Sequence, residues 1–294
     1  MKKYYLLPLF LLFLTISFSQ KKKNTNDGLK SSDLSGLKFR SVGPAFMSGR
    51  IADIAINPEN ENEWYVAVGS GGVWKTVNSG TTWKAITDDQ DFYSTGCITI
   101  DPHNSSKIWL GTGENVGGRH VGIGHGVFVS DNGGKSWKSM GLKSSEHISK
   151  IIVSPKDPNI VFVASQGPLW SSGGERGLYR TDNGGKTWKN VLSVNEWTGV
   201  TDIAIDHNNP NILYAATWQR HRNVASYMGG GPGTSIYKST DHGITWTEIK
   251  NGLPSSNLGK IGLAISPFDS SILYAAVETD RRNGAVYKTT NSGG

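Results

Sequence analysis

The chain has 294 residues, enough to bury a sizeable core, and a formal net charge of +6. Six lysines and two aspartates in residues 1–34 account for +4 of this charge, so residues 35–294 carry only +2. A net charge this small does not indicate a nucleic-acid partner. The single cysteine, Cys97, excludes an intrachain disulfide, and its apolar neighbours indicate a small buried side chain.

The first residues are typical of a secretory signal peptide. A basic start at Lys2 and Lys3 precedes an apolar run from Tyr4 to Phe18, and the segment 17–19 (Ser-Phe-Ser) fits a cleavage site. Residues 1–19 are therefore predicted to be removed, which would start the mature chain near Gln20. An uncleaved anchor is the alternative. Cleavage would leave no membrane span and a protein that is secreted, periplasmic or at the cell surface.

The segment after the signal is predicted to be a disordered lead-in over residues 20–34, because it is rich in Lys, Asn, Ser and Asp. Leu37–Val42 then has strand character. Residues 35–294 are expected to form the folded domain.

An eight-residue phrase recurs through this domain. It starts at Thr76, Ser130, Thr181, Ser239 and Thr289, which are 54, 51, 58 and 50 positions apart, and its form is [S/T]-x-[D/N]-x-G-x-[T/S]-W. The fifth copy stops before its Thr-Trp. A fixed period in this range predicts a solenoid, a propeller or another array.

The phrase has a structural interpretation as a hairpin corner. Its Asp or Asn is expected to accept hydrogen bonds from the turn, its Gly to supply a positive φ, and its Trp to anchor the fourth strand. A metal-binding role is disfavoured, because each turn needs its own acceptor. The predicted structural residues are Asn78, Trp83, Asn132, Trp137, Asn183, Trp188, Asp241, Trp246 and Asn291.

A second repeat runs in phase with the first. Pairs of short β-branched and aromatic runs, such as Ile51–Ile56 and Trp64–Gly69, are split by a Pro, Asn or Asp turn. The first unit is predicted to hold strands near 51–56, 64–69, 72–76 and 81–86. Four strands per unit at this spacing predict an all-β propeller with about five blades, the fifth without its last strand, so that the propeller is incomplete.

The phrases together resemble the Asp-box, or bacterial neuraminidase repeat. Residues from Leu37 to Gly294 are similar to large secreted bacterial proteins whose propellers are classed with the sortilin N-terminal domain. Segments that carry this resemblance are 42–44, 48–52, 69–76, 111–115, 145–148 and 166–170. The resemblance implies the fold; Asp-box propellers include sialidases, endo-xyloglucanases, peptide receptors and assembly factors, so it does not imply one activity.

Candidate binding residues lie in the loops opposite the predicted Asp-box corners. The second-to-third strand loops and the blade connections would share that face, where loops on a rigid scaffold carry function. Trp, Arg, Glu and His there suit a polar ligand with flat faces, although a solvated rim is the alternative for each residue. The candidates are Glu114, Arg119, His120, Trp170, Arg176, Trp218, Arg220 and Arg222.

The sequence favours binding over catalysis. A glycosidase needs two carboxylates roughly 5–10 Å apart, and the candidates are Asp88, Glu114, Glu146, Glu175 and Glu196. Endo-xyloglucanases carry R-T-D-x-G-G in the first blade, where this chain has Gly69 in place of the catalytic aspartate. Phe39–Pro44 matches only in part the F/Y-R-I-P motif near the N-terminus of sialidases. The spacing of Glu114, His120 and His125 fits no standard zinc site, and no cofactor is predicted.

We therefore expect an exported, non-catalytic propeller that binds a polysaccharide or a peptide. The alternative is a glycoside hydrolase, endo-glucanase-like or sialidase-like, whose site is completed beyond Gly294. A scaffold for cell-surface assembly is a third possibility that the sequence does not separate from the first. The oligomeric state is not predicted.

Overall fold

A computed structural model of the protein describes residues 30–37, 49–279 and 284–294. The predicted signal peptide and most of the lead-in and of Leu37–Val42 lie outside these residues. The chain divides into two compact units, Met1–Phe46 and Met47–Gly294. The described part of the first unit holds one short 3-10 helix, η1 (Ser31–Leu34), which falls within the predicted lead-in. In the described residues, no helix has the length and apolar character that a membrane crossing requires.

The second unit consists of five antiparallel sheets in chain order, which we call blades 1 to 5. Blade 1 has β1 (Ile51–Asn57), β2 (Asn60–Val68), β3 (Gly72–Thr76) and β4 (Lys84–Ala85). Blade 2 has β5 (Thr95–Asp101), β6 (Asn104–Thr112), β7 (Val127–Ser130) and β8 (Lys138–Ser139). Blade 3 has β9 (Ile148–Val153), β10 (Val161–Ser165), β11 (Gly177–Thr181) and β12 (Lys189–Leu192).

Blade 4 has β13 (Thr198–Ile205), β14 (Leu213–Gln219), β17 (Ile236–Ser239) and β18 (Thr247–Ile249). A separate small hairpin, β15 (His221–Arg222) and β16 (Tyr227–Met228), is inserted between β14 and β17. Blade 5 has three strands, β19 (Leu258–Ile265), β20 (Leu273–Thr279) and β21 (Ala285–Thr289). A second 3-10 helix, η2 (Lys143–Ser145), precedes blade 3.

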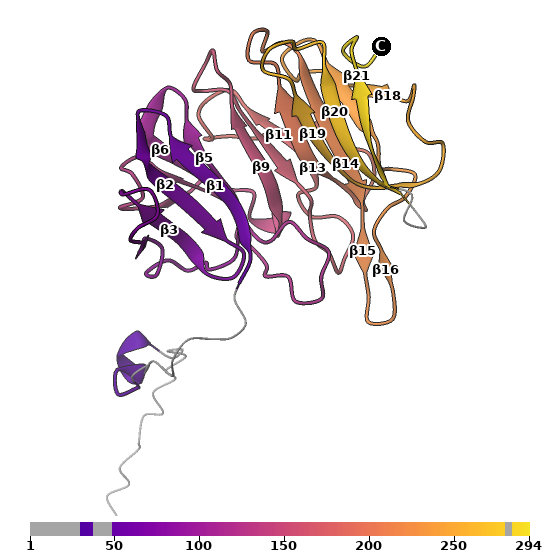
Figure 1. The fold of residues 1–294 in the computed structure, drawn as a ribbon. Helices are drawn as coiled ribbons and strands as arrows, with labels where there is room; N and C mark the ends of the chain where they lie inside the picture. Colours follow the sequence, from indigo (N-terminus) through magenta and orange to yellow (C-terminus); the bar gives the residue numbers. More distant parts are fainter. Residues whose placement is uncertain (1–29, 38–48, 280–283) are drawn as a thin grey trace, which may run out of the picture. The chain divides into compact units, whose positions relative to one another are not determined.

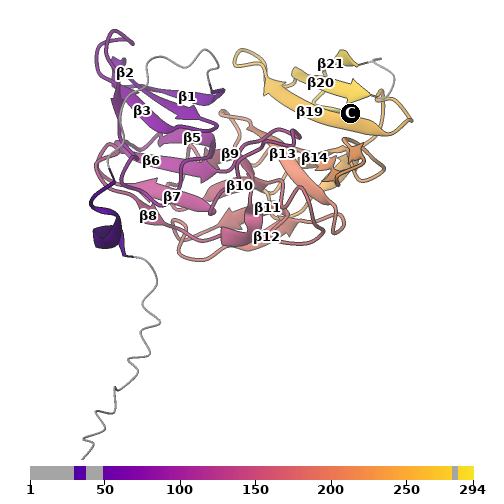
Figure 2. The ribbon, with the colours of Figure 1, turned by 90° about the horizontal axis from the view of Figure 1, so that it is seen from below.

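The hydrophobic core lies between the blades. Four apolar clusters each join two consecutive blades; the first, for example, packs Tyr65 and Val73 of blade 1 against Phe92 and Ile108 in and next to blade 2. The first strands of consecutive blades also contact one another, and Figure 2 shows β1, β5, β9, β13 and β19 on the inner side of the row of sheets. This arrangement is the predicted one: an all-β fold of four-stranded, propeller-type blades.

The outer faces of blades 1 and 5 have no such neighbour among the described residues. Ile51 and Ile54 of blade 1 are 60% and 52% exposed, and Val286 of blade 5 is 71% exposed. Both outer faces therefore carry apolar side chains that no other described blade covers.

The recurring phrases form the predicted third-to-fourth strand turns. In blade 3 the Asn183 Oδ1 atom accepts the Thr187 N–H at 3.0 Å, and the Thr181 hydroxyl accepts the Gly185 N–H at 3.0 Å. The same bonds recur in blades 1, 2 and 4. One expectation was wrong: the fourth strands begin after the Trp, since β4 starts at Lys84, because the Asp or Asn side chain holds the Thr-Trp pair in the turn.

The tryptophans of the phrases reach the preceding blade in two copies. The Trp188 indole donates to the Met140 carbonyl oxygen at 2.7 Å and meets Trp109 edge to face, with ring centroids 6.4 Å apart. Trp137 donates to the Ile86 carbonyl oxygen of the blade 1–2 connection. Trp83, in the first blade, makes no such hydrogen bond to another blade among the described residues; it meets Trp64 of its own blade edge to face and is 40% exposed. The four rings are therefore unequal as anchors.

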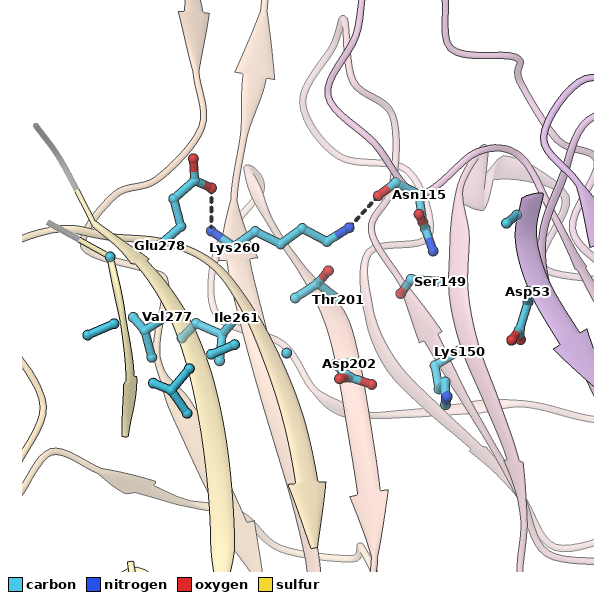
Figure 3. Close-up of a pocket in the computed structure, with 16 residues that line it drawn as sticks. Asp53, Asn115, Ser149, Lys150, Thr201, Asp202, Lys260, Ile261, Val277 and Glu278 are labelled. Carbon is cyan, nitrogen blue, oxygen red and sulfur yellow. Dashed lines mark hydrogen bonds between the residues drawn. The ribbon is translucent and has the colours of Figure 1, made fainter. Parts of the chain in front are cut away.

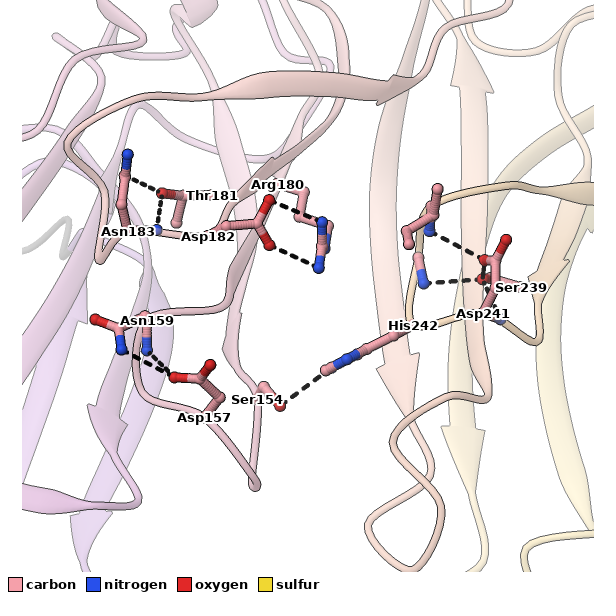
Figure 4. A network of polar contacts seen from close by, with 12 residues as sticks. Ser154, Asp157, Asn159, Arg180, Thr181, Asp182, Asn183, Ser239, Asp241 and His242 are labelled. Carbon is pink, nitrogen blue, oxygen red and sulfur yellow. Dashed lines mark hydrogen bonds and ion pairs between the residues drawn. The ribbon is translucent and has the colours of Figure 1, made fainter.

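Polar contacts join blades 3 and 4 at the same end of the sheets (Figure 4). His242 of the fourth phrase lies 3.1 Å from the Ser154 hydroxyl, through its Nε2 atom. Arg180 and Asp182 also form an ion pair at 2.7 Å, which lies within blade 3. Side chains of the turns thus add contacts between blades to the apolar core.

We expect Trp188→Ala to destabilise the protein by about 3 kcal/mol, because it removes a large packed ring and a hydrogen bond between blades. Trp83→Ala should cost clearly less, since that ring is partly in solvent. Urea unfolding of both variants and the wild type measures the difference. Equal losses would contradict the unequal anchoring.

Candidate functional site

The loop face is the end of the sheets that carries the second-to-third strand loops and the blade connections. Figure 1 shows β15 and β16 projecting at this end, opposite to the end where the last residue is marked. Two of its segments matter most here: the blade-2 loop, residues 113–126, and the blade-4 hairpin, residues 220–231. All eight predicted binding residues lie on these segments, in the blade-3 loop (residues 166–176) or at the end of β14.

Three cationic side chains hold the blade-2 loop from across the loop face. Lys260 donates to the Asn115 carbonyl oxygen at 2.6 Å. Arg220 and Arg222 donate to the next two carbonyls, at 3.0 and 2.9 Å. Hydrogen bonds from ionised donors are stronger than neutral ones. Side chains from blades 4 and 5 therefore hold the blade-2 loop in place through hydrogen bonds.

The blade-2 loop and the blade-4 hairpin also touch directly. Arg119 donates to the Val224 carbonyl oxygen at 3.0 Å, at the tip of the hairpin. The Arg222 guanidinium lies over the Tyr227 ring, 4.3 Å from its centroid. Both arginines were predicted to contact a ligand, and each uses at least one donor for a hydrogen bond within the protein.

Arg176 and Arg220 are almost fully buried, at 4% and 0% exposure. Arg176 donates to the carbonyl oxygens of Gln166, Pro168 and Ser171, and Arg220 to that of Gly167 at 3.1 Å. Burial lowers the pKa of the Arg220 guanidinium, and the charge of Arg176 adds to the fall. These two residues fix the loops around them, so in this structure they do not offer the open, forked donors that the sequence suggested.

Trp218 is likewise covered, at 3% exposure. Its indole donates to the Gly229 carbonyl oxygen at 2.8 Å, and Arg220 and Lys260 lie 5.1 and 5.4 Å from its ring centroid. The ring packs beneath the hairpin and two cations, so it is not a surface platform here.

Glu114 occupies the space next to Gly69. Its carboxylate forms an ion pair with Arg50 and accepts the Gly122 N–H at 3.0 Å, and the side chain is only 2% exposed. A Cβ atom at Gly69 would lie 3.0 Å from the Glu114 Cδ and closer still to its Oε1. Gly69 is the position at which the endo-xyloglucanase resemblance requires an aspartate. The glutamate from the next blade fills that volume.

Glu146 and His147, in the connection from blade 2 to blade 3, were not among the predicted binding residues. His147 is fully buried, and its Nε2 atom lies 4.0 Å from the half-covered Glu146 carboxyl. Burial lowers the pKa of His147 to about 3, and the charges of Arg220 and Arg176 act in the same direction. Burial also raises the pKa of Glu146. Segment 145–148 carries part of the family resemblance, and Glu146 was a candidate carboxylate of a glycosidase, but the sequence did not predict the groups around the pair, because they come from distant loops.

The exposed part of the loop face presents fewer groups than predicted. Trp170 is 43% exposed and Tyr227 is 40% exposed. Arg119 and His120 are exposed on the blade-2 loop. Trp197 and His221 pack at the base of the hairpin with their rings tilted by 56° and their centroids 4.4 Å apart. These aromatic and polar groups form the accessible candidate surface.

A cavity of about 860 Å³ lies on the inner side of the sheets (Figure 3). One wall is polar and includes Asp53, Lys150 and Asp202, and the other, from β19 to β21, is largely apolar. Asp202 accepts the Leu263 N–H of blade 5 at 2.7 Å, and Asp53 accepts the Ile98 N–H of blade 2 at 3.0 Å. The two carboxylates thus serve first to join neighbouring blades.

The described residues offer little for metal or thiol chemistry. Within the described ranges, no cluster of three or more His, Cys, Asp or Glu side chains could hold a metal ion. Cys97 is buried, and burial together with the charge of Asp53 raises the pKa of its thiol. The thiolate that a nucleophile needs is therefore disfavoured.

A comparison with models of known protein families finds no match. Curated relatives include the xyloglucanase of Hypocrea jecorina, 28% identical over 258 residues, which cover 75% of this chain and 28% of the relative. The xyloglucanase Xgh74A of Acetivibrio thermocellus is 24% identical over 75% of this chain and 28% of its own length. A Paenibacillus xyloglucanase is 24% identical over 87% of this chain and 26% of its own length. The chain thus spans less than a third of these relatives.

Solved structures support the fold. An ancestral GH74 enzyme matches 81% of this chain and 30% of its own chain, with a TM-score of 0.62 and 19% identity. A GH74 enzyme from Niastella koreensis matches 83% of this chain and 37% of its own, with a TM-score of 0.62 and 18% identity. Together with the sheet order, these likenesses confirm the β-propeller fold.

We expect Gly69→Asp to destabilise the protein, because the new side chain would compete with the Glu114 carboxylate for one volume. In a Glu114→Ala background the same change should cost less, with a coupling of about 1–3 kcal/mol between the two sites. A double-mutant cycle by chemical denaturation measures it. Gly49→Asp is the control, since its Cβ would meet only a Val68 methyl group at 3.4 Å. Additive effects of the two changes would refute the shared volume.

The buried His147 should make the protein acid-sensitive. Its folded pKa of about 3 lies below the ordinary value of 6.5, so the unfolded state takes up a proton first as the pH falls. The stability that the neutral ring contributes is full above about pH 6.5 and is lost toward pH 3, by up to about 1.4 kcal/mol per pH unit. His147→Leu should flatten this loss in denaturation measured from pH 7 to 4. The exposed His120→Gln is the control and should leave it unchanged.

Proposed function

We propose that this propeller segment recognises a polysaccharide related to xyloglucan through its loop face. The observation that carries the proposal is the similarity to xyloglucanases over three quarters or more of the chain, in relatives from a fungus and from bacteria. The sequence alone left a polysaccharide and a peptide open as ligands, and the relatives favour the polysaccharide.

The exposed groups of the loop face support this ligand. A pyranose ring has an apolar face and a rim of hydroxyls, which an aromatic side chain with nearby polar groups complements. Trp170 supplies a half-exposed indole, and Arg119, His120 and His221 supply polar groups in the neighbouring loops. Among the predicted ligand residues, we therefore assign contact to Trp170, Arg119 and His120. Glu114, Arg176, Trp218, Arg220 and Arg222 would support the surface from within.

Hydrolysis is the second candidate function, and the names of the relatives favour it. In this chain, however, the first-blade aspartate of the endo-xyloglucanases is replaced by Gly69, and the carboxylate beside it belongs to a covered ion pair, Glu114 with Arg50. A hydrolase built on this chain would need other carboxyl groups. Recognition without catalysis in this segment is therefore the function that we put first.

The remaining assignments follow the same proposal. We group the turn phrases with the Asp-box repeats of sortilin-like propellers, since each uses a side-chain acceptor and a positive-φ residue to close the corner. Residues 1–19 would be a signal peptide, residues 20–34 a lead-in and residues 35–294 part of the propeller. Export would bring the protein to the polysaccharide outside the cytoplasm.

The test is xyloglucan binding by the purified protein, measured by isothermal titration calorimetry. We expect Trp170→Ala to weaken binding at least tenfold, as for a central aromatic contact. Trp83→Ala is the matched control: the ring is 40% exposed but lies on a turn phrase, at the other end of the sheets. It should leave the affinity unchanged.

Other outcomes separate the alternatives. Release of reducing ends from xyloglucan by the same protein would place hydrolysis ahead of simple recognition. Binding to a peptide array without any binding to xyloglucan would replace the polysaccharide with a peptide ligand. A loss of xyloglucan binding in Trp83→Ala, but not in Trp170→Ala, would move the site away from the loop face.

A further inference from the structure

Glu146 stands out on the loop face because its carboxyl is partly accessible while its neighbours are buried. Its side chain is 29% exposed, and that of His147 is 0% exposed. The charges of Arg176 and Arg220 act on it from below. Among the described residues, no hydrogen bond is found to its carboxyl oxygens; the nearest cationic or imidazole nitrogen is His147 Nε2, at 4.0 Å.

The two arginines do not neutralise this carboxyl by direct pairing. Their guanidinium groups donate to backbone carbonyls, those of Gln166 and Ser171 from Arg176 and those of Val116 and Gly167 from Arg220. Glu146 is therefore not the acidic half of a buried ion pair. Its carboxyl keeps its hydrogen-bonding capacity for something outside the protein.

The imidazole next to it has no well-formed hydrogen bond. Neither ring nitrogen of His147 has a partner with good hydrogen-bond geometry among the described residues, although the ring is fully buried; the backbone of Glu114 lies close enough to act on its pKa. Buried polar groups are usually satisfied, and an exception indicates a bound water or ligand, or a functional group. An unpartnered buried ring directly beside a half-exposed carboxyl is the second sign of a site.

The backbone of Glu146 is held in a conformation that L-residues rarely adopt, with φ 57° and ψ −36°. In the described residues five non-glycine residues have positive φ, and three of them belong to the turn phrases. The Glu146 carbonyl oxygen accepts the Gly124 N–H of the blade-2 loop at 2.8 Å, which fixes this geometry. Such strain persists where the surrounding structure imposes it and is concentrated at functional sites.

We infer that Glu146 is a ligand-contacting carboxyl of the loop face, which accepts a hydrogen bond from a sugar hydroxyl. The inference rests on the proposed function, because the polysaccharide supplies that donor. Burial raises the pKa of this carboxyl, and the charges of Arg176 and Arg220 act in the opposite direction. The hydrogen bond from the Gly124 N–H to the Glu146 carbonyl oxygen fixes the backbone that carries the group.

The test compares Glu146→Gln with Glu175→Gln for xyloglucan binding across pH 4 to 7. Glu175 is the matched control: its carboxylate lies in the blade-3 loop but is already occupied by the Ser144 N–H and hydroxyl, at 2.8 and 2.9 Å. We expect Glu146→Gln to weaken binding about tenfold, because a neutral amide replaces the charged acceptor of a charge-assisted hydrogen bond. The variant should also lose the pH dependence that the wild type shows, and Glu175→Gln should keep both.

A second variant separates contact from structure. Glycine tolerates positive φ at no steric cost, so Glu146→Gly should keep or raise the melting temperature while it weakens binding as much as Gln does. A melting temperature that falls in Glu146→Gly would assign Glu146 a structural role and overturn the inference. Wild-type affinity and pH profile in Glu146→Gln would overturn it too, with the proposed function intact. A wild-type protein that binds no xyloglucan would overturn both.

Discussion

The packing of sheet on sheet governs the whole second unit. Each blade has two apolar faces, and a blade's core is shared with its neighbours: the cluster between blades 3 and 4, for example, combines Phe162 and Leu178 with Ile203 and Leu213. A single four-stranded sheet could not bury these side chains by itself. The blades are therefore stable only when packed against one another. The ends of the packed sheets form a rigid base for the loops.

The loop face shows a different kind of order. Long loops expose backbone carbonyls that the sheets cannot satisfy, and an unpaired buried carbonyl is costly. Here Lys260, Arg176 and Arg220 supply the missing donors. Because one guanidinium has several N–H groups, it can join carbonyls from two or three loops at once. This arrangement buries positively charged side chains, few of which are paired with a carboxylate.

Much of the fold was predictable from the sequence, because each copy of the repeated phrase determines the same local turn. The phrase from Thr181 to Trp188 specifies its own turn through Asn183 and Gly185, so the three further complete copies specify three further turns. The fourth strands were misjudged by two or three residues, since the turn bond from the Asn holds Thr and Trp outside the ladder. Those bonds are visible only when the side chain is in place.

The site was less predictable, because an arginine that holds a loop and an arginine that awaits a ligand look alike in a sequence. Arg220 and Arg119 both lie in loop segments, yet one is fully buried and the other is exposed. Their difference arises from contacts between residues more than 100 positions apart, such as Arg220 with the Val116 carbonyl. Glu146 was named only as a candidate carboxylate of a glycosidase, and not as a binding residue, for the same reason: its surroundings depend on His147, Arg176 and Arg220 together, and on a backbone conformation that the residue type does not predict.

Gly69 and Glu114 show how the repeated fold and the contacts between distant loops act together. A glycine in the blade-1 turn leaves a space that a side chain would fill, and the covered Glu114 carboxylate fills it from blade 2 while it binds Arg50 and the Gly122 N–H. A carboxylate so placed stabilises its own loop against blade 1, but it is too covered to touch a substrate. Glu146, on the same face, has the opposite character: its carboxyl is accessible and unpaired, over buried groups that hold it in position. If this face acts on a polysaccharide, we expect contact at Glu146 and not at Gly69, where the endo-xyloglucanase resemblance would require an aspartate.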